Sequence, residues 1–266
     1  SDMGRELVEH FTCCTDFVEI EKQLQETNEF KQVLLFEDPF PAQDYYDLRE
    51  VLVRIRIDGT YIELDELAAL RAFINTIIQA FVYFKVRNEE QKFPRLWAIC
   101  QDIMPEKGIV EAINKILDPK GQLRDNASDE LRRIKSEINR ISSDADRRIR
   151  KLLNAAKQDG ITKEDAEMTV RNGRLCIPVS AQFKRRLKGF VHDESATGQT
   201  VFIEPAEVFD ANNEIKDLLN AQHREVIRIL TEITCFIRPS IENLLFGHQF
   251  LGHLDFIRAK ALFAID

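Results

Sequence analysis

The chain has 266 residues, of which 44% are hydrophobic and 31% charged, and a formal net charge of -8. It has only ten glycines and eight prolines, which favours helices. No run of about 18 apolar residues is present, so no membrane span is expected. The acidic balance argues against binding nucleic acid over the whole surface, but leaves room for one local basic patch.

Cysteine usage bears on the compartment. The five cysteines are an odd number and form no C-x-x-C pair, which indicates reduced structural thiols in the cytosol rather than a disulfide framework or a zinc site. They are Cys13, Cys14, Cys100, Cys176 and Cys235.

Residues 1–127 are predicted to form a helical core. Residues 1–36 have helical spacing, with Thr15 as an N-cap inside the segment. The prolines of residues 38–41 break the helix, and a short helix follows near residues 48–55. The helix that opens at Leu64 is apolar on more than one face, so we expect it at the centre of the core. Two shorter helices, 93–104 and 109–117, complete this region.

A long helix is predicted over residues 128–158, with Ser128 as its N-cap. Its apolar residues recur at alternating steps of three and four, as in a coiled coil, and the pattern slips near Ile149. At 1.5 Å per residue the helix extends about 45 Å. Since its other faces are mostly charged or polar, we expect it to project as an arm.

A small β element is predicted over residues 159–204. Asn172-Gly173 between two short apolar runs is a strong hairpin signal. The second strand contains Pro178, which favours an edge position. Residues 188–193 and 199–203 form a second strand pair, joined by the turn at residues 195–198.

A second long helix is predicted over residues 205–238, and a return helix to the core over residues 239–266. The simplest arrangement pairs the two long helices antiparallel, with the sheet at their tip. The predicted fold class is therefore mainly α: a helical core and two long antiparallel helices that carry a small antiparallel β element.

One segment of the sequence is basic, although the chain as a whole is acidic. Between Thr169 and Phe190 there are six cations and no carboxylate. Such a cluster can neutralise phosphates and bind a polyanion without reading its sequence. A solvated loop balanced by acidic neighbours is an equally good interpretation from the residues alone. The six candidate nucleic-acid-binding residues are Arg171, Arg174, Lys184, Arg185, Arg186 and Lys188.

Other residues of the chain are of types that bind metals or act in catalysis. His192-Asp193-Glu194 suggests a metal-dependent hydrolase, but adjacent residues of a strand point to opposite faces and converge poorly on one metal. His248 and His253 lack the i,i+4 spacing of a zinc protease. The cations of residues 147–151 lie near the expected tip and extend the basic patch. We expect no catalytic residue, metal or cofactor in this chain. A module that pairs with another protein through its helical seams remains an alternative.

Several segments resemble type-two MutS proteins, over nearly the whole chain and most specifically over residues 170–215. The matching segments are Val170-Arg171-Asn172-Gly173-Arg174-Leu175-Cys176-Ile177-Pro178-Val179, the run from Lys188-Gly189-Phe190-Val191-His192 to Phe202-Ile203-Glu204-Pro205, Asn212-Asn213-Glu214-Ile215, and Leu254-Asp255-Phe256-Ile257-Arg258-Ala259-Lys260-Ala261.

The resemblance implies a function. It implies a core, a lever and a clamp that precede an ABC-type ATPase, with ATP and Mg in the full-length protein. No G-x-x-x-x-G-K-[ST] loop occurs here, so we expect a piece of a longer protein. The family implies a cytoplasmic homodimer, no membrane, a possible separate nuclease domain, and branched or recombination DNA as the partner, with suppression of recombination. Members tied to collided ribosomes make rRNA the alternative partner.

Overall fold

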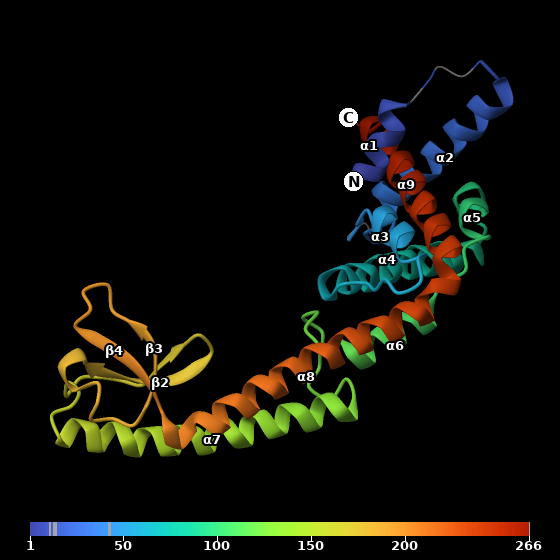
Figure 1. Ribbon diagram of the computed structural model, residues 1–266. Coiled ribbons are helices and arrows are strands. Elements are labelled where there is room, and N and C mark those ends of the chain that lie inside the picture. Colours follow the sequence, from blue (N-terminus) through green and yellow to red (C-terminus); the bar gives the residue numbers. More distant parts are fainter. Residues whose placement is uncertain (11, 13–14, 42–43, 266) are drawn as a thin grey trace. The chain divides into compact units, whose positions relative to one another are not determined.

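A computed structural model describes residues 1–10, 12, 15–41 and 44–265. The described chain is mainly helical with one small antiparallel sheet, as predicted (Figure 1). It divides into two compact units, Ser1–Ala127 with Arg228–Asp266, and Ser128–Ile227. The long helix α8 (Ala206–Ile237) contributes its first part to the second unit and its last part to the first.

In the first unit the described elements are helices joined by loops and turns, with one isolated antiparallel β-bridge between Leu117 and Leu123. Helix α9 packs against α1, α2, α3 and α4, while α4 also packs against α5 and α6. These helices are α1 (Asp2–Glu9), α2 (Phe17–Phe36), α3 (Arg49–Arg54), α4 (Leu64–Asn88), α5 (Pro94–Cys100), α6 (Lys107–Ile116) and α9 (Ile241–Phe263), with a short 3-10 helix (Arg238–Ser240) before α9.

Helix α4 has the central place that its sequence predicts. By length and composition it is the one helix of the described chain that is apolar enough to cross a membrane, a candidate that the sequence reading missed. However, Leu67, Leu70, Phe73, Ile74 and Phe84 are buried in the packing. The apolar character is thereby accounted for by a protein core on several sides.

The N-terminal helix prediction needs a correction. The expected N-cap was Thr15, but Asp16 caps α2, because its side chain accepts a hydrogen bond from the amide of Val18 at 2.9 Å. A carboxylate at this position also complements the helix dipole. Phe11, Cys13 and Cys14 lie outside the described residues.

A buried acid joins α2 to α9. The Glu26 side chain is 2% exposed, with Lys22 Nζ and His253 Nε2 each 3.9 Å from its carboxylate. Burial raises the pKa of Glu26, while Lys22 and Lys260 act in the opposite direction and Glu19 and Glu29 add to the rise. Folding therefore shifts this carboxyl group toward its neutral form relative to the unfolded chain.

We expect Glu26→Gln to stabilise the protein at neutral pH. A carboxyl whose pKa is raised by folding contributes most stability below its unfolded pKa, and that contribution is lost as pH rises through the folded pKa. The variant should therefore lose part of the wild-type decrease in stability above pH ~4.5. Urea unfolding at several pH values measures this, with the exposed Glu21→Gln as control. Lower stability of Glu26→Gln at neutral pH would mean that the nearby cations outweigh burial.

The second unit combines two long helices and the sheet. Figure 1 shows α7 (Asp129–Gln158) and the first part of α8 side by side, with the sheet where α7 ends and α8 begins. The predicted N-cap is confirmed, since Ser128 Oγ accepts from the Leu131 amide at 3.0 Å. The same hydroxyl donates to Glu225 of α8 at 2.6 Å, which fixes the start of α7 against α8.

The sheet has the order β1-β2-β4-β3, and all neighbouring strands are antiparallel. Its strands are β1 (Thr169–Arg171), β2 (Arg174–Ser180), β3 (Gly189–Glu194) and β4 (Thr200–Pro205), with a short 3-10 helix (Ala181–Phe183) after β2. One face packs on α7 through a buried apolar cluster that includes Ile149, Leu153, Ile177, Val201 and Ile203.

Pro178 was expected on an edge strand, and this is wrong for β2 as a whole. Strand β2 lies between β1 and β4. However, β1 pairs only as far as Cys176, so Pro178 has a strand partner on one side alone, namely Phe202 of β4. The missing proline N–H is therefore compatible with an interior strand. The Pro178 carbonyl accepts a hydrogen bond from the Thr162 hydroxyl.

Candidate nucleic-acid interface

The β1–β2 hairpin carries two of the six predicted cations. Arg171 and Arg174 face each other across Asn172-Gly173, whose φ values are +51° and +76°. Two positive φ values are the signature of a type I′ turn, which only Asn, Asp and Gly adopt readily. The hairpin predicted from Asn172-Gly173 is confirmed, and it places both arginines beside the turn.

Arg174 is engaged inside the unit. Its Nη1 donates to the two carboxylate oxygens of Glu204 at 2.8 and 3.0 Å, and its Nη2 donates to Asn213 Oδ1 at 2.6 Å. The guanidinium lies 5.5 Å from the centre of the Phe209 ring, and the side chain is 18% exposed. Arg174 therefore holds the fold together, and we leave it out of the proposed ligand surface.

Glu204 is the centre of this buried cluster. Besides Arg174 it is bonded to His192 Nε2 at 2.5 Å and accepts from Asn212 Nδ2 at 2.6 Å, while its side chain is fully buried. One carboxylate thus ties β2, β3, β4 and α8 together. Sequence reasoning missed it, although an acid directly after the apolar run Val201-Phe202-Ile203 is a usable signal, because a buried charge needs a partner.

Arg171 is only partly engaged. Its Nε lies 3.4 Å from Asp193 Oδ2, and its guanidinium lies 4.2 Å from the centre of the Phe202 ring. The side chain is 40% exposed. An ion pair this exposed contributes little free energy and is readily exchanged, so Arg171 remains available to a phosphate.

The other four cations lie together on one exposed loop. It follows the short 3-10 helix, and two partly buried apolar residues, Phe183 at the end of that helix and Leu187 in the loop, pack against the buried cluster. With the apolar side chains held inward, the cations face solvent, and within the described residues none of the four has a carboxylate within 4.0 Å. They are Lys184, Arg185, Arg186 and Lys188.

Helix α7 carries further cations near its C-terminal end. Arg147 is paired with Asp144, whereas Arg148, Arg150 and Lys151 are exposed and have no ion-pair partner among the residues described. Leu152 packs on the same apolar cluster as Phe183 and Leu187. The two groups of cations therefore border one cluster, although they are far apart in sequence. From the sequence, the cations of residues 147–151 are expected to extend the basic patch, and this stays a prediction.

The structure separates the residues considered for metal or hydrolytic chemistry. His192 faces Glu204, Asp193 faces Arg171, and Glu194 is exposed. Within the described part of the chain, no three His, Cys, Asp or Glu side chains gather as metal ligands do. Burial raises the pKa of the Cys176 thiol to about 11, so it is not a reactive thiolate at neutral pH.

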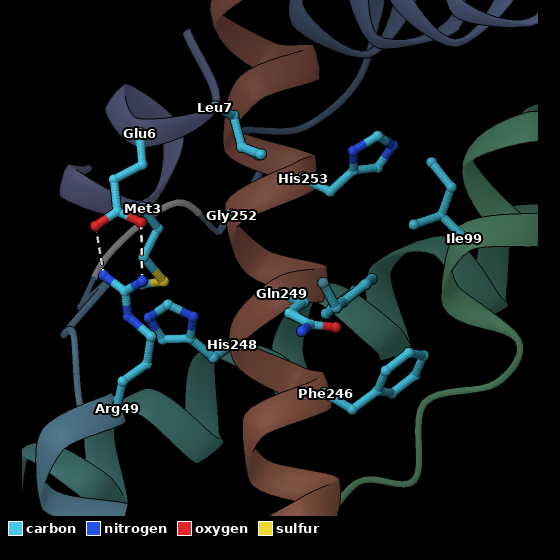
Figure 2. A pocket seen from close by; sticks show the side chains of 11 residues that line it. Met3, Glu6, Leu7, Arg49, Ile99, Phe246, His248, Gln249, Gly252 and His253 are labelled. Atoms are coloured by element: carbon cyan, nitrogen blue, oxygen red, sulfur yellow. Dashed lines mark hydrogen bonds and ion pairs between the residues drawn. The ribbon is translucent and has the colours of Figure 1, made fainter. Parts of the chain in front are cut away.

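A pocket of about 490 Å³ in the first unit has its charged groups paired with one another (Figure 2). Arg49 bonds to both Glu6 and Asp47, and His248 Nε2 lies 3.1 Å from Asp47. Hydrogen bonds from Arg49 lower the pKa of Asp47 to about 2. Burial lowers the pKa of His248. These groups stabilise the packing of α1, α3 and α9 rather than offering free charges to a ligand.

The fold and the charged surface define a mainly helical protein that carries a small antiparallel sheet with one basic loop. No protein-family model matches the chain. Curated proteins named endonuclease MutS2 do match it: the Geobacillus sp. (strain WCH70) protein is 33% identical over 99% of this chain, and those of Staphylococcus haemolyticus and Fusobacterium nucleatum are 32% and 28% identical over 99% and 100% of it.

The chain is thus homologous to the MutS2 proteins over nearly its whole length, which confirms the resemblance inferred from the sequence. It spans only about a third of the length of the curated relatives it matches, 34% for each of these three.

Proposed function

We propose that this chain is a nucleic-acid-binding region of a MutS-type protein, and that the sheet and the α7 end grip the phosphate backbone of branched or recombination-intermediate DNA. The observation that carries this proposal is the exposed loop Lys184–Lys188, whose four cations have no carboxylate partner among the described residues. Exposed unpaired Lys and Arg exchange condensed counterions for contacts with phosphates, which favours binding without sequence preference.

The proposed role of the intact, longer protein builds on this binding of nucleic acid. In the proposed intact protein, a cytoplasmic homodimer, an ATPase loaded with ATP and Mg moves the clamp, and the binding suppresses recombination. The region described here hydrolyses nothing itself, and a nuclease domain lies elsewhere in the longer protein. Structured rRNA, as on a collided ribosome, presents the same phosphate chemistry, so RNA binding is one outcome of the test.

We expect neutralisation of the loop to weaken binding at least about tenfold at low salt and to reduce the salt slope by about 0.9 for each phosphate that the protein no longer neutralises. The variant is Lys184→Gln, Arg185→Gln and Arg186→Gln together. Fluorescence anisotropy with a four-way junction, a duplex and a structured RNA, each over a range of salt, measures both quantities.

The matched control removes three exposed charges from the first unit, with Lys107→Gln, Lys115→Gln and Lys120→Gln together. It has the same net charge as the loop variant, so non-specific attraction falls equally in both. If the two variants bind equally, the loop is not the contact. If structured RNA binds more tightly than the junction at the same salt, the partner is RNA. If the unsubstituted protein binds neither DNA nor RNA, an interaction with another protein becomes the better interpretation.

A further inference from the structure

The second unit contains a pocket whose lining residues lie outside the exposed loop Lys184–Lys188, which we call the cation loop. It has a volume of about 420 Å³ and lies between the C-terminal turns of α7 and the segment that leads into β1. This volume is in the range of small-ligand sites. Its principal lining residues are Arg150, Leu153, Asn154, Lys157, Glu167 and Met168.

One face of α7 forms one wall. Residues 150, 153, 154 and 157 recur at steps of three and four, so their side chains lie along one stripe of the helix. The opposite wall exists because the chain reverses after α7. Gly160 has φ +64°, and the amide of Ile161 donates to the Ala156 carbonyl at 2.9 Å, as in a helix end closed by a left-handed glycine.

The pocket has an apolar floor. Leu153 belongs to the buried apolar cluster of the second unit, and Met168 packs partly buried against the same cluster. Thr162 and Ser180 hold the reversed segment against β2, through bonds to the Pro178 and Ile161 carbonyls. The floor is therefore a fixed part of the fold, and since Leu153 is only 7% exposed, a flat ring would contact it through Met168. Thioethers such as that of Met168 also contact aromatic rings favourably.

The polar groups lie around this floor. Arg150 is exposed and Lys157 is half-buried, and in the described structure neither has a carboxylate within 4.0 Å. Two cations on one stripe suit a phosphate group. Asn154 offers an amide, and Glu167 offers an acceptor for an amino group. The pocket thus offers cations for a phosphate, an apolar floor for a flat ring, and polar groups for the edge of that ring. A nucleotide combines these three parts.

We propose that this pocket binds one 5′-nucleotide, and that the nucleotide is an unpaired residue of the nucleic acid held by the cation loop. The phosphate lies on Arg150 and Lys157, and the base lies over Leu153 and Met168 with its polar edge toward Asn154 and Glu167. This inference rests on the proposed function, since the loop supplies the strand. It adds a preference for DNA or RNA with extrahelical bases.

The methionines provide a direct probe of the pocket. The chain has only three, and Met168 is the one in the second unit, while Met3 and Met104 lie in the first. In protein labelled with ¹³C at the methionine methyls, titration with nucleoside 5′-monophosphates should shift the Met168 methyl resonance and leave the other two unchanged. Arg150→Gln with Lys157→Gln should weaken this binding about tenfold, whereas Arg132→Gln on the same helix should not change it. No shift of Met168 overturns the proposal.

The second arm identifies the source of the nucleotide. A duplex with one extrahelical nucleotide should bind more tightly than the perfect duplex and than a duplex with an abasic residue in the bulge. Arg150→Gln with Lys157→Gln should abolish this preference, whereas the triple loop variant should weaken all three duplexes and leave their ratio unchanged. If only the free nucleotide binds, the strand is excluded as the source. Salt-sensitive DNA binding without a Met168 shift would overturn the pocket and leave the proposed function standing. A Met168 shift without DNA binding would overturn the proposed function, and with it the strand as the source of the nucleotide, but not the pocket as a nucleotide site.

Discussion

Glu204→Ala is expected to destabilise the second unit by roughly 3–5 kcal/mol, the usual cost of removing one partner of a buried ion pair. The substitution leaves the Arg174 guanidinium, which is 18% exposed, without its carboxylate. It also removes the acceptor of Asn212 and the partner of His192. Since these groups come from three strands and α8, the substitution should loosen the sheet from the helix rather than disturb one local interaction.

Hydrogen exchange provides the measurement for Glu204→Ala. The only tryptophan, Trp97, lies in the first unit, so its fluorescence does not follow the sheet. Amide exchange in β2 and β4 should become faster by the corresponding factor. The control is Glu194→Ala, an exposed acid on β3, for which a change within about 0.5 kcal/mol is expected.

A double-mutant cycle with Arg174→Ala tests the mechanism of this effect. The double variant should be less destabilised than the sum of the two single variants, because neither charge is then left alone. Additive effects would show that the Glu204–Arg174 pair is not the source of the stability.

Phe84→Ala is expected to destabilise the first unit by about 3–5 kcal/mol, as for other buried aromatic truncations. Phe84 is 1% exposed, and its ring centre lies 5.5 Å from that of Phe40 and 6.3 Å from that of Phe30. The substitution opens a cavity where α2, α4 and the proline-containing segment before α3 meet. It also removes the edge-to-face contact with Phe30 and the tilted contact with Phe40, and such ring pairs contribute beyond the buried area.

Trp97 provides the measurement for Phe84→Ala, because its ring packs 5.7 Å from that of Phe81 on the same helix α4. The midpoint of urea unfolding by tryptophan fluorescence should fall for the variant. Val86→Ala, on an exposed position of α4, should leave the midpoint nearly unchanged. If Phe84→Ala lowers the urea midpoint no more than Val86→Ala does, the neighbouring side chains close the cavity left by the ring.

The elements of the fold were largely predictable because their signals are local. The 3.6-residue periodicity predicts α4, α7 and α8, Ser128 marks the start of α7, and Asn172-Gly173 marks the hairpin turn. The errors also have local causes. Thr15 and Asp16 are both good N-caps, and only the formed helix shows which side chain reaches the free amide.

From the sequence, the candidate site could be predicted only as a segment rich in cations, without the arrangement of their side chains. The window of six cations is visible in the sequence, and four of the six, Lys184, Arg185, Arg186 and Lys188, lie exposed on one loop without a carboxylate partner in the described structure. The pocket lined by Met168 was not predictable from the sequence. One wall comes from α7 and the other from the segment that leads into β1, and no residue spacing indicates that these two walls face each other.

By itself the sequence determined which segments are helices, which form the hairpin and where positive charge accumulates, since periodicity, capping and turn chemistry act over a few residues. Only the tertiary structure decided which cations face solvent. Arg174 is bound by Glu204 and Asn213, which follow it by 30 and 39 residues, whereas Lys184–Lys188 have no carboxylate partner in the described chain because Phe183 and Leu187 anchor their loop through apolar contacts. A buried charge must find its partner wherever the folded chain brings one within hydrogen-bonding distance, and that partner need not be near in sequence.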